Sequence, residues 1–495
     1  MTTATIIETL SERVIKVIER SHQFSLDPTD NKWNLTNSQL KTLQEVDDWS
    51  QDEDLLTYVI AGEAGVGKTT ITQLITKLLR KYSMALLAPT HKACKVLSGM
   101  TGLEAVTAHA LLGLRPNLDL ADLDICDEAS MVSSALKELI IKEATKSRTR
   151  IIFIGDRFQL PPPGEEVSPV FAEADHISYM DEPARQHPDN PLTLPLAALR
   201  NDMEPTDKSI KRVIDLAILF GMDEDTIQLL RDNPINMFKV LIRNKESVMN
   251  DKGEGYTIMK NVGEFDDKLL EAFEEVSVDE PNACRFLSFM NSRVRDKNLI
   301  IREKLFPDTC DNILNEGDWL LSYTSIFNET TKTKIITNSA EYKVKSITNG
   351  IKYHKMIDEN GHSVEKALRV YHVKLKGITD NDTVISVVNP DDYHIYSELH
   401  DYFHQNGVAY GKWYPYYKFA HSALVLGDVP PLYKGQKVPK KHLDYAFGIT
   451  VHKSQGSTFR NVYIDGKNIR DSYEISKSVF KKRYKREPEK ADLLR

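Results

Sequence analysis

The chain has 495 residues, of which 41% are hydrophobic and 27% are charged, and its formal net charge is -8. These values are ordinary for a globular protein, and a chain of this length exceeds what one hydrophobic core supports. The acidic balance argues against a protein that coats nucleic acid with its whole surface, although it permits a local basic groove. The four cysteines, Cys94, Cys126, Cys284 and Cys310, lack the paired spacing of a zinc site or a disulfide framework.

Residues 1–30 are predicted to form a short N-terminal helix and a polar linker. Their apolar residues recur at helical spacing and are interrupted by Glu, Arg and Lys. The segment therefore lacks the continuous apolar stretch of a signal peptide or a membrane span, and no later stretch has one. We expect a protein without a membrane partner, located in the cytoplasm.

Residues 31–203 are predicted to form a first α/β domain. The strand-like runs TYVIAG, MALLAPT, LDICDEAS and RIIFIGD alternate there with amphipathic helices. Strands separated by helices indicate a parallel sheet covered on both faces. A second α/β domain is predicted over residues 204–342 and 443–495. Short strand-like runs followed by aromatic-rich helical sequence predict a small β-barrel insert with a helical extension over residues 343–442.

A complete phosphate-binding loop, Gly62–Thr69, lies between a predicted strand and a predicted helix. Its glycines let main-chain N–H groups surround phosphate oxygens at a helix N-terminus. Lys68 is expected to neutralise the β- and γ-phosphates of ATP, and the hydroxyl of Thr69 to ligate Mg²⁺. The residues expected to bind the nucleotide are Gly62, Gly65, Gly67, Lys68 and Thr69 of this loop and Thr70, which follows it.

Two further groups of catalytic type follow at the ends of predicted strands. Asp127 is expected to hold the Mg²⁺ shell, and Glu128 to orient and deprotonate the attacking water. The strand RIIFIGD leads to Asp156 and Gln159. An amide such as that of Gln159 suits a γ-phosphate sensor, because it both donates and accepts hydrogen bonds.

In this order the motifs resemble those of superfamily 1 helicases, within the 5′→3′ branch that contains the phage Dda helicases and RecD. The resemblance is carried by LTNSQ, APTHKA, DEAS, GDRFQLPP, EPARQ and TVHKSQGST. It implies two tandem RecA-like domains, with an SH3-like barrel and helical extension inserted in the second. It also implies an enzyme that couples ATP hydrolysis to 5′→3′ movement on single-stranded DNA and to duplex unwinding.

The resemblance assigns roles to further residues. It implies that Gln39 reads adenine, that Arg185 reaches the γ-phosphate, and that Gly456 belongs to a motif coupling the nucleotide to DNA. The residues it places on single-stranded DNA are Pro89, Thr90, His91, Lys92, Thr107, His109, Asn291, Thr450, His452 and Lys453. The implied partners are single-stranded DNA and duplexes with a 5′ overhang. Single-strand-binding and replisome proteins are further candidates.

Two stretches depart from the family pattern. Residues 110–126 leave little chain for the projecting hairpin that splits the duplex in Dda-like enzymes. After residue 458 no stretch resembles the L-Y-V-A-x-T-R strand, whose arginine completes the γ-phosphate clamp. The chain is then a fragment, or a second chain supplies this strand, or ATP is hydrolysed poorly. The alternative function is an ATP-dependent DNA-binding module with weak or no hydrolysis.

Overall fold

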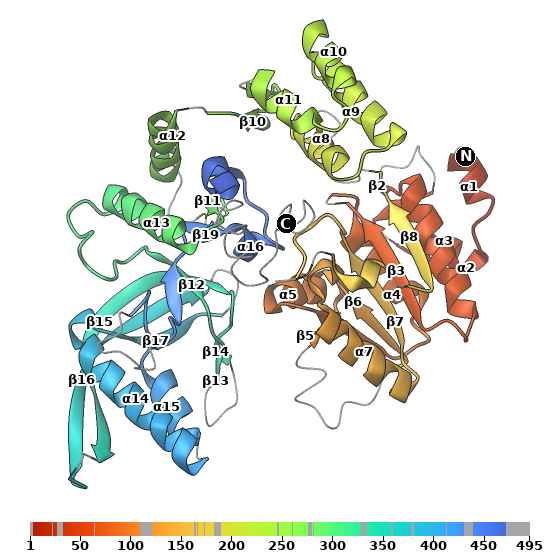
Figure 1. Cartoon of the computed structure of the whole chain (residues 1–495). Helices are drawn as coiled ribbons and strands as arrows, with labels where there is room; N and C mark the ends of the chain where they lie inside the picture. Colours follow the sequence, from red (N-terminus) through yellow and green to blue (C-terminus); the bar gives the residue numbers. More distant parts are fainter. Residues whose placement is uncertain are drawn as a thin grey trace, which may run out of the picture. The chain divides into compact units, whose positions relative to one another are not determined.

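The computed structural model in Figure 1 shows a chain that divides into two compact units, Met1–Phe265 and Asp266–Leu494. The boundary between them falls within one helix, α12. The structure describes residues 3–21, 23–26, 33–63, 65–108, 121–162, 165, 167–172, 174–182, 190–244, 247–259, 261–275, 280, 282–327, 334–357, 360–377, 381–411, 413–429 and 439–471.

A six-stranded parallel sheet forms the centre of the first unit, with the strand order β5-β4-β6-β7-β3-β8. Its strands are β3 (Thr57–Gly62), β4 (Met84–Ala88), β5 (Ala105–Thr107), β6 (Leu123–Cys126), β7 (Arg150–Gly155) and β8 (His176–Met180). Every residue of β3 and β6 is buried, as expected for strands covered on both faces. The four strand-like runs of the predicted first domain fall on β3, β4, β6 and β7, which confirms the parallel α/β core.

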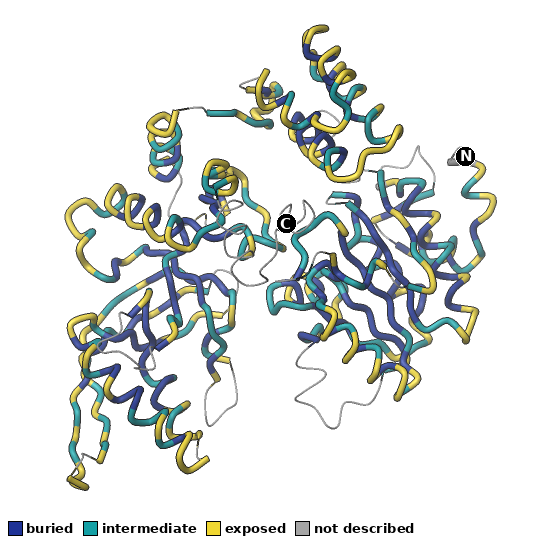
Figure 2. The backbone as a smooth tube through the Cα atoms, in the orientation of Figure 1, coloured by how far each residue is buried: buried dark blue, intermediate teal, exposed yellow. Residues whose placement is uncertain are grey.

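Helices cover both faces of this sheet. They are α1 (Thr3–Ile7), α2 (Glu12–Glu19), α3 (Asn37–Gln51), α4 (Lys68–Leu78), α5 (His91–Thr101) and α7 (Ser134–Ser147). Successive residues of β3 belong to different cores: Ile60 packs in one cluster with Leu74 of α4, and Val59 in another with Ile140 of α7. This is the two-residue alternation of a strand between two helical layers. Figure 2 shows the buried residues concentrated on these strands.

The N-terminal segment differs from the predicted helix and linker. It forms two short helices, and Val14 and Ile18 of α2 belong to the same core cluster as Leu74. The helical spacing of the apolar residues was the correct signal. The break after α1 was missed, because Ser11 ends the helical run by capping α2 with a hydrogen bond from the Val14 N–H. A short parallel pair, β1 (Phe24–Ser25) and β2 (Trp33–Asn34), follows.

A helical cluster completes the first unit. It contains α8 (Thr193–Met203), α9 (Asp207–Leu219), α10 (Glu224–Asp232), α11 (Met237–Asn244) and the antiparallel pair β9 (Ser247–Met249) and β10 (Gly255–Thr257). One hydrophobic core joins Leu194 and Ala198 of α8 to Val213 of α9 and Leu230 of α10. Residues 204–265 therefore group with the first unit, whereas the sequence predicted that the second domain begins at residue 204. The charged faces of these helices concealed the apolar faces that pack on α8.

The second unit contains a three-stranded parallel sheet with the order β19-β11-β20. Its strands are β11 (Cys284–Ser288), β19 (Gly448–Thr450) and β20 (Asn461–Ile464), and the helices of this part are α12 (Val262–Glu275), α13 (Asn291–Leu305) and α16 (Val451–Ser454). The sheet thus joins two segments that lie far apart in the sequence, as expected for an α/β domain interrupted by an insert.

An antiparallel sheet with the order β17-β16-β15-β12-β18 forms the rest of the second unit. Its strands are β12 (Trp319–Ser322), β15 (Glu341–Ile357), β16 (Ser363–Gly377), β17 (Thr383–Val388) and β18 (Leu443–Tyr445); the pair β13 (Ile326–Phe327) and β14 (Lys334–Ile336) and the helices α14 (Tyr393–Tyr410) and α15 (Tyr414–Ser422) accompany them. β15 and β16 form a long hairpin (Figure 1). An antiparallel sheet in the second half was predicted, but it includes β12 and β18, which flank the predicted insert.

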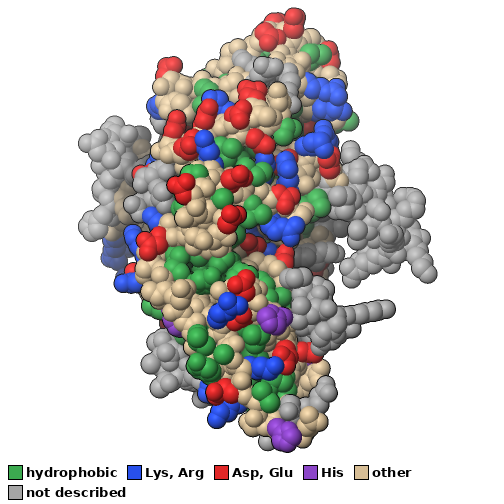
Figure 3. All heavy atoms as spheres, turned by 90° about the vertical axis from the view of Figure 1, so that its left-hand side faces the viewer, with side chains coloured by type: hydrophobic (Ala, Val, Ile, Leu, Met, Phe, Trp, Pro, Cys, Tyr) green, Lys and Arg blue, Asp and Glu red, His purple; other side chains and the backbone are tan. Residues whose placement is uncertain are grey.

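The sequence predicted a chain with no membrane-spanning segment and without a uniformly basic surface. In the described part of the chain, no helix is both long and apolar enough to cross a membrane. On the face drawn in Figure 3, Lys and Arg side chains are interspersed with Asp and Glu, and hydrophobic side chains gather between them. The described part of this face therefore lacks the broad basic field of a protein that coats nucleic acid.

A buried ion pair links the two sheets of the second unit. Arg285 of β11 lies 2.7 Å from Glu341 of β15, with side chains 0% and 3% exposed, and Arg285 also donates to the main-chain oxygen of Ala446. The guanidinium lies over the ring of Trp319, 5.4 Å from its centroid. A charge at this depth is tolerated only while it is paired.

We predict that Glu341→Ala destabilises the second unit by about 3–5 kcal/mol, because it leaves Arg285 buried without its carboxylate. Urea denaturation followed by tryptophan fluorescence measures this, since Trp319 lies against the pair. The control is Glu271→Ala, which breaks an exposed pair with Lys268 and should change stability by less than about 0.5 kcal/mol. Equal losses for the two variants would contradict the prediction.

Candidate functional site

The candidate nucleotide site lies at the carboxyl ends of three neighbouring parallel strands. In the register of the sheet, Cys126 of β6 is opposite Phe153 of β7, and Gly155 of β7 is opposite Ala61 of β3. The residues that follow these strands therefore meet at one edge of the sheet. This edge is where ligands bind in open parallel α/β sheets.

The loop between β3 and α4 has the backbone of a phosphate cradle. Gly65 and Gly67 have φ values of 86° and 80°, in the left-handed region that glycine adopts without steric cost. Gly67 is the N-cap of α4 and offers no side chain to the first N–H groups of that helix. Donors of this kind, at a helix N-terminus, suit an anionic ligand.

Lys68 is the first residue of α4 and points back along the loop. Its Nζ donates hydrogen bonds to the main-chain oxygens of Gly62 and Glu63, both at 2.9 Å. Burial lowers the pKa of Lys68, and the nearby carboxylates of Asp156, Glu128 and Asp127 oppose that shift. The ammonium is therefore held among the acidic groups with which it was predicted to act.

Gln39 fastens the start of α3 to this loop. Its side chain is 2% exposed, and its Nε2 donates to the main-chain oxygen of Val66 at 2.9 Å. Its Oε1 accepts from the N–H of Thr36, which closes a capping box. The adenine-reading role of Gln39 stays a prediction, and the structure places its amide directly beside the loop.

Asp127 and Glu128 occupy a constrained turn after β6. The Asp127 N–H donates to the main-chain oxygen of Leu87 at 2.9 Å, and the Glu128 N–H donates to the Asp127 carboxylate at 2.9 Å. Glu128 has a φ of 54°, a conformation that is strained for any residue other than glycine. Burial, reinforced by the charge of Asp127, raises the pKa of Glu128 to about 7. Burial also raises the pKa of Asp127, against the effects of the Glu128 N–H and Lys68.

The turn that carries Gln159 packs closely against this acidic turn. The Ser130 hydroxyl donates to Gln159 Oε1 at 3.4 Å, and the Gln159 N–H donates to the main-chain oxygen of Asp156 at 3.0 Å. Gly155 permits the approach, because a Cβ there would lie 3.0 Å from the main-chain nitrogens of Ala129 and Ser130. The structure thus brings Lys68, Asp127, Glu128 and Gln159 together at one edge of the sheet, and their catalytic roles stay predictions.

The donor set fits a divalent metal that is shared with phosphate. The described residues contain no group of three or more His, Cys, Asp or Glu side chains that could hold a metal ion by themselves. Mg²⁺ is usually bound by one or two protein oxygens together with phosphate oxygens. Thr69, the second residue of α4, and Asp127 supply donors of this type.

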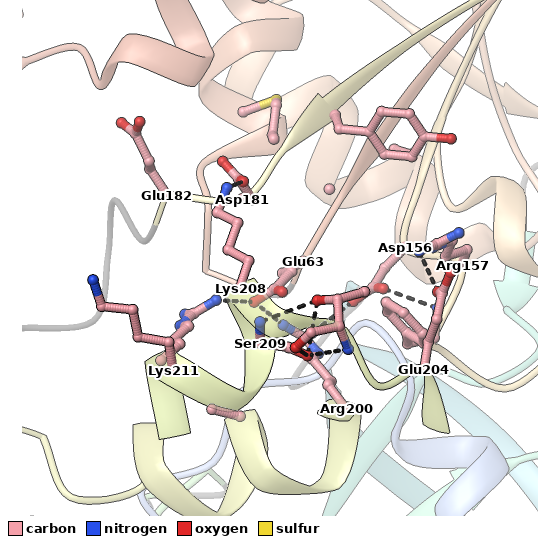
Figure 4. A pocket seen from close by; sticks show the side chains of 18 of the residues that line it. Glu63, Asp156, Arg157, Asp181, Glu182, Arg200, Glu204, Lys208, Ser209 and Lys211 are labelled. Atoms are coloured by element: carbon pink, nitrogen blue, oxygen red, sulfur yellow. Dashed lines mark hydrogen bonds and ion pairs between the residues drawn. The ribbon is translucent and has the colours of Figure 1, made fainter. Parts of the chain in front are cut away.

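A cavity of about 730 Å³ lies beside the loop, within the first unit (Figure 4). The ends of β3, β7 and β8 form one wall, and α8 and α9 form the other. The charged residues that line it are Glu63, Asp156, Arg157, Asp181, Glu182, Arg200, Glu204, Lys208, Lys211, Arg212 and Asp215. The sequence reading missed Arg200 and Arg212, because they belong to no motif.

Several predicted features lie outside the described residues. These are Arg185 in residues 183–189, His109 and most of the short interval in residues 109–120, and the tail from residue 472 onward. Their predicted roles stay as stated above.

The described residues among those predicted to contact DNA form one group in each unit. In the first unit, Thr107 at the end of β5 is opposite Ala88 of β4, so it lies beside Pro89 and Thr90. The Thr90 hydroxyl caps α5 by accepting the N–H of Ala93 at 3.2 Å, and the helix begins with His91 and Lys92. Each strand end again places its group at the carboxyl edge of the sheet.

In the second unit, Thr450 at the end of β19 is opposite Ser288 of β11, the strand that leads to Asn291. His452 is exposed and packs edge-on against Phe289, with 5.6 Å between the ring centroids. Lys453 Nζ donates to Ser339 Oγ at 3.0 Å. Gly456, with a φ of 70°, follows in the turn after α16.

Known proteins resemble this chain. A family model described as an AAA domain matches residues 34–212. The ATP-dependent DNA helicase Dda of Enterobacteria phage T4 is 29% identical over 280 residues, which are 52% of this chain and 54% of the phage protein. The ATP-dependent RecD2 DNA helicase of Deinococcus radiodurans is 39% identical over 114 residues, 21% of this chain and 16% of that protein. A crystal structure of Bacteroides Pif1 bound to single-stranded DNA aligns with 87% of this chain and 85% of its own, at 17% identity and a TM-score of 0.37.

We predict that Glu128→Gln raises the stability of the first unit at pH 8 by about 1–3 kcal/mol. Above a pKa of about 7, Glu128 is ionised in the folded protein against the cost of burial, and the neutral amide removes that cost. As the pH falls through 7 the folded protein binds a proton at Glu128, so the gain should shrink toward pH 5. Thermal unfolding of both proteins across this pH range tests it.

The matched control is Glu138→Gln, at an exposed position on α7. This variant should follow the parent protein at every pH. A gain for Glu128→Gln that does not change with pH would contradict the assignment of the shifted pKa to this side chain.

Proposed function

We propose that this chain, which belongs to the superfamily 1 DNA helicases of the Dda and RecD type, couples ATP hydrolysis to 5′→3′ movement along single-stranded DNA and to duplex unwinding. The observation that carries the proposal is the meeting of Lys68, Asp127 and Glu128 with Gln159 at one edge of the parallel sheet. The chain spans about half of the length of Dda. Polarity and unwinding come from the family resemblance.

The chain's own groups supply most of the chemistry of hydrolysis. N–H groups of the loop and the first turn of α4 would receive the phosphates, and Lys68 would neutralise their charge. Glu128, with its raised pKa, would take the proton of the attacking water, and the Gln159 amide would orient the γ-phosphate. Mg²⁺, held by Thr69 and Asp127, would add positive charge at the phosphate oxygens.

Movement along DNA requires two grips that alternate. The described residues predicted to contact DNA fall into two groups, with Pro89, Thr90, His91, Lys92 and Thr107 in the first unit and Asn291, Thr450, His452 and Lys453 in the second. Each group follows directly from strands of its unit's parallel sheet, and in the first unit that sheet also carries the nucleotide site. A change between nucleotide states can therefore alter the grip of each unit on the phosphate backbone.

We expect single-stranded DNA to stimulate the ATPase activity of the chain, and Lys68→Ala to lower that activity by about 100-fold or more, because the phosphates lose their fixed cation. A colorimetric phosphate-release assay with and without a DNA oligonucleotide measures both effects. The control is Lys77→Ala, at an exposed position on the same helix, which should retain the parent activity. Absence of stimulation by any DNA would reject the helicase proposal.

Strand-displacement assays test the direction of movement. A duplex with a 5′ overhang should be unwound in the presence of ATP, whereas a duplex with a 3′ overhang should not. ATP-dependent DNA binding without turnover would instead support the alternative of a DNA-binding module with weak hydrolysis.

A further inference from the structure

One guanidinium on α8 joins two carboxylates that come from different strands of the nucleotide site. Arg200 Nη2 lies 2.9 Å from Asp156 Oδ2, and its Nη1 forms an ion pair with Glu63 (Figure 4). The side chain of Asp156 is 2% exposed, and those of Arg200 and Glu63 are 20% and 22% exposed. Removing one partner of an ion pair at this depth costs more than removing a partner on the open surface, because it leaves a charge buried without compensation.

On one side, Arg200 fixes the turn that presents Gln159. While one oxygen of Asp156 faces Arg200, the other accepts the N–H of Phe158 at 3.0 Å. The main-chain oxygen of Asp156 accepts the N–H of Gln159. The Asp156 side chain therefore links Arg200 to the N–H of Phe158 within the turn.

On the other side, Arg200 fixes the first residue after β3. Glu63 carries the carboxylate that pairs with Arg200, and its main-chain oxygen accepts a hydrogen bond from Lys68 Nζ. Arg212 of α9 also pairs with Glu63, at 3.2 Å. Two arginines, Arg200 and Arg212, thus form ion pairs with the Glu63 carboxylate.

The other basic residues of the cavity do not duplicate the contact with Asp156. Arg157 pairs with Glu204, and Lys208 pairs with Asp181. Within the described ranges, Arg200 is the one cation at ion-pair distance from Asp156. Loss of Arg200 would leave the buried Asp156 carboxylate without its ion-pair partner. The charge of this carboxylate raises the pKa values of Lys68 and Glu128.

We infer that Arg200 is a positioning residue of the ATPase site, which holds the Gln159 turn and the Lys68 loop in their reactive arrangement through Asp156 and Glu63. The inference rests on the proposed ATPase function and adds a residue that no motif contains. It requires the planar fork of arginine, because two carboxylates from different strands are bound at once.

The test compares the kcat and KM of DNA-stimulated ATP hydrolysis in four single variants. Arg200→Ala should lower kcat by about 10- to 100-fold, since a small misplacement of a catalytic group has effects of that size. The KM for ATP should change less than about threefold, because the loop that binds the phosphates keeps its second support from Arg212. Arg200→Lys should recover part of the loss, since an ammonium can keep one of the two pairs.

Two arginine variants calibrate the result. Arg212→Ala leaves the Asp156 pair intact and should lower kcat less than Arg200→Ala does. Arg231→Ala removes an arginine of the same helical cluster from an exposed pair with Glu224 and should behave like the parent protein. Circular dichroism and thermal unfolding verify that each variant is folded.

A double-mutant cycle with Asp156→Asn separates positioning from a general loss of structure. Asparagine keeps an acceptor for the Phe158 N–H but needs no cation, so Arg200→Ala should cost several-fold less kcat in that background. Equal losses in the two backgrounds, or a parent-like kcat for Arg200→Ala, would overturn the inference. A loss confined to KM would assign Arg200 to nucleotide binding and would overturn it as well. A parent protein without DNA-stimulated turnover would refute the proposed function instead.

Discussion

The parallel pairing of β6, β7 and β3 is the constraint on which the candidate nucleotide site depends. Because the three strands run in the same direction, the segments that follow them must emerge at one edge of the sheet. Asp127, Gln159 and the phosphate-binding loop come from segments separated by many residues, and the register alone brings them together. Gly155, which has no Cβ, then lets the turn that carries Gln159 pack closely against the turn of Asp127 and Glu128.

Several carboxylates are buried together at this site, where burial disfavours their ionised forms. Asp127, Glu128 and Asp156 lie near one another, and the strained φ of Glu128 adds a local cost. Lys68 and Arg200 offset part of this charge: Arg200 pairs with Asp156, and the three carboxylates act on the Lys68 ammonium. Such a site is less stable than an apolar edge would be, and carboxyl groups with raised pKa values, as at Asp127 and Glu128, are typical of catalytic centres.

The sequence predicted those features that depend on local rules. The loop glycines and the apolar strands β3, β6 and β7 can be recognised from short contiguous stretches of sequence. The family resemblance then assigned roles to the motifs that follow these strands. The sequence did not predict that α9–α11 pack on α8, that β12 and β18 join the antiparallel sheet, or that Arg200 reaches Asp156. These are contacts between distant segments, and a single arginine on an amphipathic helix gives no sign of its partner.

The buried pair of Arg285 and Glu341 restricts how this protein can drift in evolution. Loss of the charge at either position alone leaves the other charge buried and unpaired between the two sheets. A single substitution of this kind therefore destabilises the protein. Replacement by an apolar pair is physically acceptable, but it requires both codons to change nearly together. Homologues should therefore carry either both charges or neither. The two positions should co-vary even though they belong to different sheets.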